Sequence, residues 1–160
     1  MALFVSNYTN KIDRKGRVSV PAPFRQILAT KGSDLVVLYP HPKYPAIEGS
    51  GMDWLEDYER RLAQLPEYDE DRDALQATLF SQVCQITPDS EGRVILPENL
   101  VSRAGIGENA IFVGAGRKFE IWEPARFAAH QEKMQARVKE RNLTVPAPIR
   151  ATAAAPGAVL

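Results

Sequence analysis

The chain has 160 residues, of which 44% are hydrophobic and 25% charged, and its 20 Lys and Arg residues balance its 20 Asp and Glu residues. This composition is typical of a globular protein with one domain or two small ones, and it excludes an intrinsically disordered chain. No apolar run approaches the roughly 18 residues that span a bilayer, and a lone cysteine cannot form an internal disulfide. We therefore expect a cytoplasmic protein with neither a membrane segment nor a secretory signal.

Charge is distributed unevenly along the chain. Residues 1–40 carry six cations and two anions, whereas residues 41–80 carry four cations and ten anions. The opening stretch is therefore a candidate binding face for a polyanion, although a run of charge is more often a solvated surface.

The first predicted elements are two short strands joined by a basic turn. The strands are expected over residues 2–7 and 18–20, and the turn and second strand read DRKGRVSVP, from Asp13 to Pro21. Gly16 suits a turn position with positive φ, and Pro21 ends the strand because proline cannot donate to a ladder.

A helix and two more strands are predicted next. Phe24, Ile27 and Leu28 recur at helical spacing. Strands are expected over residues 34–39 and near residues 46–48. A longer helix follows, with Asp53 and Glu56 in a capping-box pattern. The apolar face of that helix comprises Leu55, Tyr58, Leu62 and Leu65.

The remaining chain is predicted to repeat this order after an acidic connection. The acidic stretch from Pro66 to Asp73 is expected to begin a helix that continues to Leu79. Strands follow over residues 82–86, 94–96, 110–113 and 119–122, with a short helix before the last two. A final helix begins at Pro124, which is tolerated in a first turn, and carries Phe127, Met134 and Val138 on one side.

An internal duplication explains this order. The segment DSEGRVILP, from Asp89 to Pro97, matches DRKGRVSVP at an offset of 76 residues, and Leu35–Val37 match Ile111–Val113 at the same offset. The predicted organisation has four parts, which are an N-terminal repeat (1–65), an acidic linker and helix (66–80), a C-terminal repeat (81–141) and a disordered Ala/Pro-rich tail (142–160).

The two Asp-x-x-x-Arg turns, each leading to a hydrophobic strand and a proline, resemble those of the MraZ family of bacterial transcriptional regulators. The resemblance covers about residues 1–140. It implies an α+β, mainly β fold of two tandem AbrB-like swapped-hairpin units, packed as a pseudo-dimer and each followed by a helix. It also implies a ring-shaped homo-oligomer that associates with the nucleoid. Such a ring would bind short direct repeats of double-stranded DNA and repress its own division and cell-wall operon.

The resemblance places the DNA contacts on Arg14, Lys15 and Arg17 of the first turn. The residue types agree, because Arg can pair with a guanine edge and Lys can meet a phosphate. Lys11 is a weaker phosphate candidate. The alternative is that exposed cations merely solubilise a hairpin, and Arg17 stays divided between a DNA contact and a clamp within the turn.

Residues that both turns retain are expected to shape them, whereas Ser90 and Glu91 replace the tip cations in the second turn. An Asp can accept backbone N–H groups across a turn, and an Arg can bind that Asp through a charge-assisted bond. The residues expected to have this structural role are Asp13, Gly16, Asp89, Gly92 and Arg93.

Other candidate residues give no chemical signal. Neither His41 nor His130 has a partner at metal-ligand spacing, so neither a metal site nor a cofactor is expected. Arg25 is expected on a solvated helix face, and Cys84 within a strand. The sequence shows no acid/base pair, nucleophile or phosphate loop, so we expect neither an enzyme nor a small-molecule substrate. The alternative function is a protein-interaction module, antitoxin-like or partner-regulating, without specific DNA binding.

Overall fold

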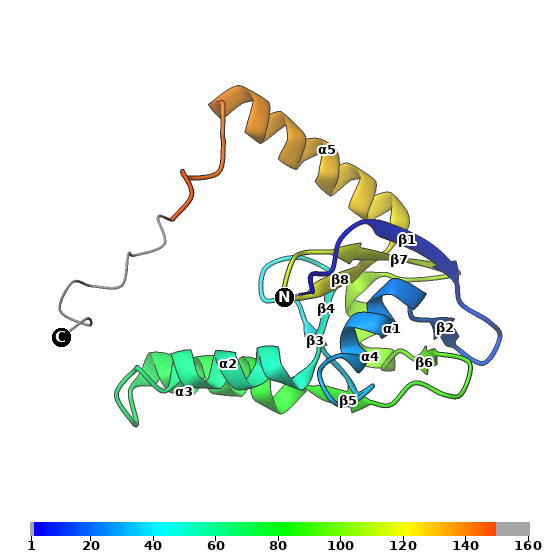
Figure 1. Ribbon diagram of the computed structural model, residues 1–160, viewed down its shortest axis with the longest axis horizontal. Helices are drawn as coiled ribbons and strands as arrows, with labels where there is room; N and C mark the ends of the chain where they lie inside the picture. The colour runs from blue at the N-terminus through cyan, green and yellow to red at the C-terminus, as the bar shows by residue number, and fades with distance from the viewer. Residues whose placement is uncertain (1, 150–160) are drawn as a thin grey trace, which may run out of the picture. The chain divides into compact units, whose positions relative to one another are not determined.

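The computed structural model describes residues 2–149 (Figure 1). Contacts divide the chain into a compact unit that ends at Phe127 and a second unit that begins at Ala128. The expected α+β class is confirmed, and every strand pair among the described residues is antiparallel. The helices hold more of these residues than the strands do, so "mainly β" does not describe the content.

The same order of elements occurs twice, separated by a helix (Figure 1). The first series is β1 (Asn7–Lys11), β2 (Arg17–Ser19), α1 (Ala22–Ala29), β3 (Val36–Pro40), β4 (Ile47–Ser50) and α2 (Met52–Leu62). Helix α3 (Glu70–Leu79) and the 3-10 turn η1 (Phe80–Gln82) follow. The second series is β5 (Cys84–Ile86), β6 (Arg93–Ile95), α4 (Glu98–Ala104), β7 (Asn109–Gly114), β8 (Phe119–Trp122) and α5 (Pro124–Arg141).

The two halves pair their strands with each other. A six-stranded sheet has the order β1-β7-β8-β4-β3-β5, and β2 and β6 form a separate pair. Strands β1, β2, β3 and β4 of the first half therefore each contact a strand of the second half. In the β2–β6 pair, Val18 lies opposite Val94, its own counterpart in the repeat. Each half thus depends on the other for its sheet.

The strand register corrects the single offset of 76 residues predicted from the sequence. Tyr8 lies opposite Phe112, and Cys84, the counterpart of Tyr8 at that offset, lies opposite Leu38. The structural counterpart of Leu38 is therefore Phe112, two residues before the position that the offset gives. A shift of two residues keeps every side chain on its face, because strand side chains alternate with a period of two.

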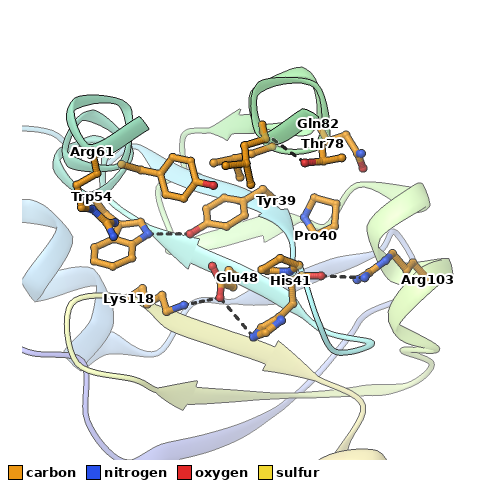
Figure 2. A pocket seen from close by; sticks show the side chains of 14 residues that line it. Tyr39, Pro40, His41, Glu48, Trp54, Arg61, Thr78, Gln82, Arg103 and Lys118 are labelled. Atoms are coloured by element: carbon orange, nitrogen blue, oxygen red, sulfur yellow. Dashed lines mark hydrogen bonds and ion pairs between the residues drawn. The ribbon is translucent and has the colours of Figure 1, made fainter. Parts of the chain in front are cut away.

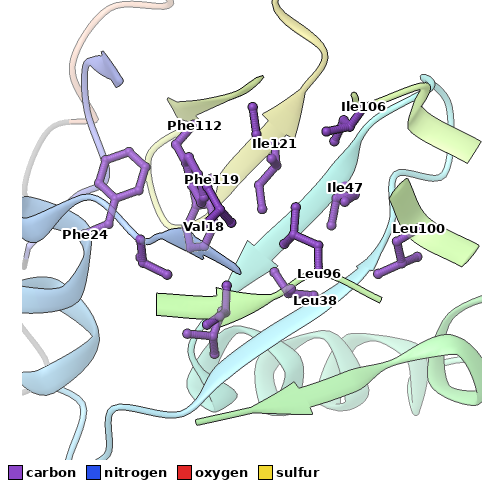
Figure 3. Close-up of a cluster of buried hydrophobic side chains, with 14 of the residues drawn as sticks. Val18, Phe24, Leu38, Ile47, Leu96, Leu100, Ile106, Phe112, Phe119 and Ile121 are labelled. Carbon is purple, nitrogen blue, oxygen red and sulfur yellow. The ribbon is translucent and has the colours of Figure 1, made fainter. Parts of the chain in front are cut away.

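The main core lies between one face of the six-stranded sheet and a cover formed by α1, α4 and the β2–β6 pair (Figure 3). Phe4, Phe24 and Phe119 form its aromatic centre, with each pair of rings 5.1 to 5.2 Å apart. Strand alternation places Leu38 in this core and Tyr39 on the opposite face, where α2 and α3 cover β3. The two faces of the sheet therefore pack against different sets of helices.

Two further expected details were wrong. Strand β1 begins at Asn7 rather than Ala2, because Ser6 has a φ of 69° that breaks the extended path. The capping box at Asp53 and Glu56 does not form, since α2 begins after Gly51 without a side-chain cap. Asp53 instead accepts a hydrogen bond from Lys31, with 2.7 Å between Nζ and Oδ2.

The acidic connection folds as predicted, with a helix that extends to Leu79. The Asp69 carboxylate accepts hydrogen bonds from the backbone N–H groups of Asp71 and Arg72 and so caps α3. Residues 142–149 are exposed and have no regular secondary structure, and residues 150–160 of the predicted tail lie outside the described part of the chain. No helix within residues 2–149 has the length and apolarity needed to cross a membrane.

The close approach of β4 and β8 gives a first prediction. Gly49 lies opposite Phe119, and a Cβ at this position would overlap the Phe119 ring. We expect Gly49→Ala to lower the free energy of unfolding by about 1–3 kcal/mol, measured by urea denaturation, because a packed core resists added volume.

Gly107→Ala is the matched control, because a Cβ at Gly107 would meet no atom within 4 Å. Its effect should stay within about 0.5 kcal/mol. Equal losses in the two variants would contradict the packing assigned to Gly49.

Candidate nucleic-acid interface

The first turn, residues 13–17, is closed by the Asp13 carboxylate and by two hydrogen bonds between backbone groups. One of the two joins the Asp13 N–H to the Arg17 carbonyl at 2.9 Å. Asp13 Oδ1 accepts hydrogen bonds from the backbone N–H groups of Lys15 and Arg17, both at 2.9 Å. The Gly16 N–H donates to the Asp13 carbonyl at 3.0 Å, and Gly16 has a φ of 81°. The chain therefore needs both an acceptor side chain at Asp13 and a residue without a Cβ at Gly16.

Arg17 completes this turn with an ion pair. Its Nε lies 2.6 Å from Asp13 Oδ2, and its side chain is 30% exposed. The Arg17 backbone N–H lowers the pKa of Asp13, desolvation opposes this, and the Arg17 side chain adds to the lowering. The Asp13 carboxylate thus stays charged and compensates much of the Arg17 charge.

Arg14 and Lys15 form the tip of the first turn, and both are exposed. Within residues 2–149, neither side chain has an ion-pair partner within 4.0 Å. A hollow of about 500 Å³ beside the tip is lined by Lys11, Ile12, Asp13, Arg14 and Glu108. The tip therefore presents two positive charges without an ion-pair partner, and Lys11 and Glu108 lie at the same edge.

The second turn, residues 89–93, has the same internal bonds with different charges at its tip. Asp89 Oδ1 accepts from the backbone N–H groups of Glu91 at 2.9 Å and Arg93 at 3.0 Å, and Arg93 Nε donates to Asp89 Oδ2 at 3.0 Å. The Arg93 backbone N–H is the main cause of the lowered pKa of Asp89. Arg93 also pairs with Glu91 at 3.1 Å, so this turn lacks the uncompensated cations of the first.

Arg25 lies elsewhere than expected. Instead of facing solvent, its guanidinium packs against Gly92 of the second turn, and its Nε donates to the Val20 carbonyl at 3.0 Å. Gly92 leaves room for this contact because it has no Cβ. The sequence did contain a signal that Arg25 has a particular contact. The equivalent position of the second repeat is Val101, so the two repeats differ here.

A cavity of about 680 Å³ lies between β3, α2 and α3, away from both turns (Figure 2). Trp54 Nε1 donates to the Tyr39 hydroxyl at 2.8 Å, and Lys118 is hydrogen-bonded to Glu48 at the cavity wall. Burial raises the pKa of Tyr39 far above its ordinary value, and the Glu48 charge raises it further. The main polar side chains of this wall are therefore already paired with each other.

Beside this cavity, His41 lies close to two carboxylates that sequence spacing did not reveal. Its Nε2 is 3.4 Å from an oxygen of Glu48 and 3.4 Å from an oxygen of Glu120. The three ligand-type atoms of this group lie within 4.8 Å of one another. They come from a loop, β4 and β8, so only the strand pairing that sets Glu48 opposite Glu120 brings them together.

The hydrogen bonds of His41 favour a hydrogen-bonded network with the two carboxylates over a metal site. Its Nδ1 accepts the backbone N–H groups of Lys43 at 3.0 Å and Tyr44 at 3.1 Å. In the neutral ring the proton must therefore lie on Nε2, where it faces the carboxylates and blocks the lone pair that a metal would need.

Comparisons with known proteins add the family context. The MraZ family profile, described as "MraZ protein, putative antitoxin-like", matches residues 79–153. The transcriptional regulator MraZ of Azorhizobium caulinodans is 42% identical over 140 residues, which cover 88% of this chain and 89% of the relative. The proteins of the same name from Beijerinckia indica (43% over 140 residues, 88% and 85% covered) and Rickettsia canadensis (40% over 145 residues, 91% and 97% covered) are similarly related.

The His41 network predicts a pH-dependent contribution to stability. Burial raises the pKa of Glu120, but hydrogen bonds from His41 and Trp122 outweigh it, and the folded-state pKa falls below the ordinary value of 4.5. A lowered pKa means that the contribution is complete above about pH 4.5 and is lost as the pH falls through the folded-state pKa.

We expect Glu120→Gln to lower the free energy of unfolding by about 1–3 kcal/mol near pH 7. The difference from the wild type should shrink at about pH 3, as measured by urea denaturation at both pH values. Glu132→Gln, at an exposed position of α5, is the control. A difference for Glu120→Gln that does not change with pH would contradict the charged network.

Proposed function

Because the chain belongs to the MraZ family of transcriptional regulators, which are not enzymes, we propose that it is a sequence-specific DNA-binding protein that represses its own division and cell-wall operon. The observation that carries this proposal is the first turn. Among the described residues, no carboxylate lies within 4.0 Å of the charged groups of Arg14 and Lys15 at its tip, whereas the equivalent turn of the second half holds Ser90 and Glu91.

The geometry gives each candidate residue a different proposed role in binding DNA. Arg14 has the planar fork that can pair with a guanine edge in the major groove, and Lys15 supplies a point charge for a phosphate. Arg17 donates its Nε–H to Asp13, so we assign Arg17 to the ion pair that closes the turn. Its remaining N–H groups are available to the backbone of DNA. Lys11 is a weaker phosphate contact.

The remaining turn residues are proposed to hold the backbone in shape. Asp13 and Asp89 each accept two backbone N–H groups, and Gly16 and Gly92 adopt positive φ. Arg93 has the clamp role in the second turn without DNA contact, because the neighbouring Glu91 would repel phosphate.

We further propose that the two halves are tandem AbrB-like swapped-hairpin units packed as a pseudo-dimer, an arrangement supported by the strand pairing between the halves. The units would comprise residues 1–65 and 81–141, with residues 66–80 as a connector and 142–160 as a tail. The protein would act in the cytoplasm, on the nucleoid.

One subunit brings few cations to DNA, and so few phosphate contacts give only weak binding at physiological salt. We therefore propose that subunits assemble into a ring-shaped homo-oligomer and bind short direct repeats together. Linked subunits bind the second repeat at a high effective concentration, which raises overall affinity without new contacts.

A protein-interaction module remains the second candidate, in which the chain grips a basic partner. Two observations favour it, namely the antitoxin-like description of the family profile and the exposed acidic residues of the α2–α3 region, which include Glu67, Glu70 and Asp71. The next experiment separates the two functions.

Reversing both tip charges should abolish specific DNA binding. For Arg14→Glu with Lys15→Glu we expect affinity for a duplex from upstream of the protein's own gene to fall by about 100-fold or more, because two contacts become repulsive. Fluorescence anisotropy measures affinity, and light scattering with gel filtration measures oligomer size, which should not change.

Ser90→Ala with Glu91→Ala is the matched control in the second turn, and it should bind DNA like the wild type. Retained binding in the Arg14/Lys15 variant would contradict the site. If binding were absent in the wild type itself, the protein-interaction function would be favoured.

The oligomer mechanism predicts a dependence on repeat number. A duplex with several correctly spaced repeats should bind about 10²- to 10⁴-fold more tightly than a duplex with one repeat. Shifting one repeat by about half a helical turn should remove most of this gain, since the subunits could no longer reach both sites. Equal affinity for single and multiple repeats would contradict the mechanism.

A further inference from the structure

The two turns have the same internal bonds but unequal support from the rest of the protein. The Val20 N–H, at the end of β2, donates to the Gly92 carbonyl of the second turn at 3.0 Å. Within residues 2–149, no such backbone bond joins the equivalent Leu96 N–H to the Gly16 carbonyl. Gly92 is buried, whereas Gly16 is half-buried. The second turn is therefore held by the other half of the molecule, and the first turn is held mainly by itself.

Arg25 contributes to this difference. A Cβ built at Gly92 would lie 2.5 Å from each of Cζ, Nε and Nη1 of Arg25, so the guanidinium lies flat against the Gly92 backbone. The same guanidinium donates to the Val20 carbonyl, and Val20 thus bonds Arg25 through its C=O and Gly92 through its N–H. Helix α1, the end of β2 and the second turn are therefore each in contact with the other two.

The repeat does not provide the reciprocal contact. Val101 occupies the position equivalent to Arg25, and it packs against the main core. Valine has no donor, so it cannot bind a backbone carbonyl in the way that Arg25 does. A Cβ at Gly16 would find Ile95 Cγ2 at 3.8 Å as its nearest neighbour, which leaves that face of the first turn open.

We propose that Arg25 is a positioning residue that fixes the second turn and the adjoining end of β2, and so provides a rigid base from which the first turn alone adjusts to DNA. This inference rests on the proposed DNA contact of the first turn. Because β2 pairs with β6, the base fixed by Arg25 includes both strands from which the turns project.

Amide hydrogen exchange of the full chain tests the anchor without DNA. In Arg25→Ala we expect peptides that cover residues 88–96 to exchange about tenfold faster, because the second turn loses the charged group that packs on Gly92 and is hydrogen-bonded to Val20. Peptides that cover residues 12–17 should exchange as in the wild type. Unchanged exchange in the second turn, or equal acceleration in both turns, would overturn the proposal.

Arg25→Lys separates geometry from charge. Lysine keeps the positive charge but lacks the planar group that lies on Gly92 and the Nε that binds Val20. We therefore expect it to exchange like Arg25→Ala. Slow, wild-type exchange in Arg25→Lys would show that charge alone suffices and would overturn the anchor.

A comparison of two glycines provides a second, independent measurement. Gly16 and Gly92 have similar φ values of 81° and 78°, so alanine strains both backbones alike. Gly92→Ala should also displace Arg25 and accelerate exchange in the second turn about tenfold. In an Arg25→Ala background this extra acceleration should vanish. Additive effects of the two substitutions would contradict a direct contact.

DNA titrations then separate this inference from the proposed function. We expect Arg25→Ala and Arg25→Lys to weaken binding to the upstream duplex alike, by several-fold, with an unchanged slope of affinity against salt, because no phosphate contact is lost. A slope reduced by about one in Arg25→Ala and restored in Arg25→Lys would make Arg25 a phosphate contact instead. If Arg14/Lys15 reversal left binding intact, the proposed DNA contact of the first turn would fail while the exchange result stood.

Discussion

The pairing of β2 with β6 around Val18 and Val94 is the constraint on which the rest of the structure depends. Both valines are buried, and both turns project from the ends of these three-residue strands. So short a pair has little stability alone and needs a hydrophobic face to pack on. The six-stranded sheet provides that face, and it too is built from strands of both halves. The position of each turn therefore depends on both halves.

The two turns have the same backbone conformation but present different charges to solvent. In each, an Asp carboxylate accepts two backbone N–H groups and the guanidinium of the Arg four residues later. These bonds leave the two residues after the Asp free to vary, because none of the bonds involves the side chains of those two residues. Charge at the tip can therefore change without changing the shape, which is how a binding surface can be confined to one copy.

The sequence predicted the elements well where local chemistry decides them. Repeated turn residues, helical spacing around Phe24 and the acidic start of α3 each identified an element that the structure contains. The correct offset between β3 and its counterpart β7 could not be found in this way, because a shift of two residues leaves the hydrophobic pattern intact. The His41 network and the Arg25 contact were also missed, since both join residues that are distant in sequence and adjacent only after the halves pair.

The fused repeat explains why the two turns can differ at all. In a symmetric dimer of identical halves, an arginine at the position of Arg25 would anchor both turns, and basic tips would occur twice. Within one chain the positions vary independently, so Val101 can fill the core where Arg25 reaches across to Gly92. In the second turn, Arg93 compensates the carboxylate of Glu91, with 3.1 Å between Nη2 and Oε2. The asymmetry in the Arg25 contact and the asymmetry in tip charge therefore agree with the proposed division, in which the second turn stabilises the base and the first turn contacts DNA.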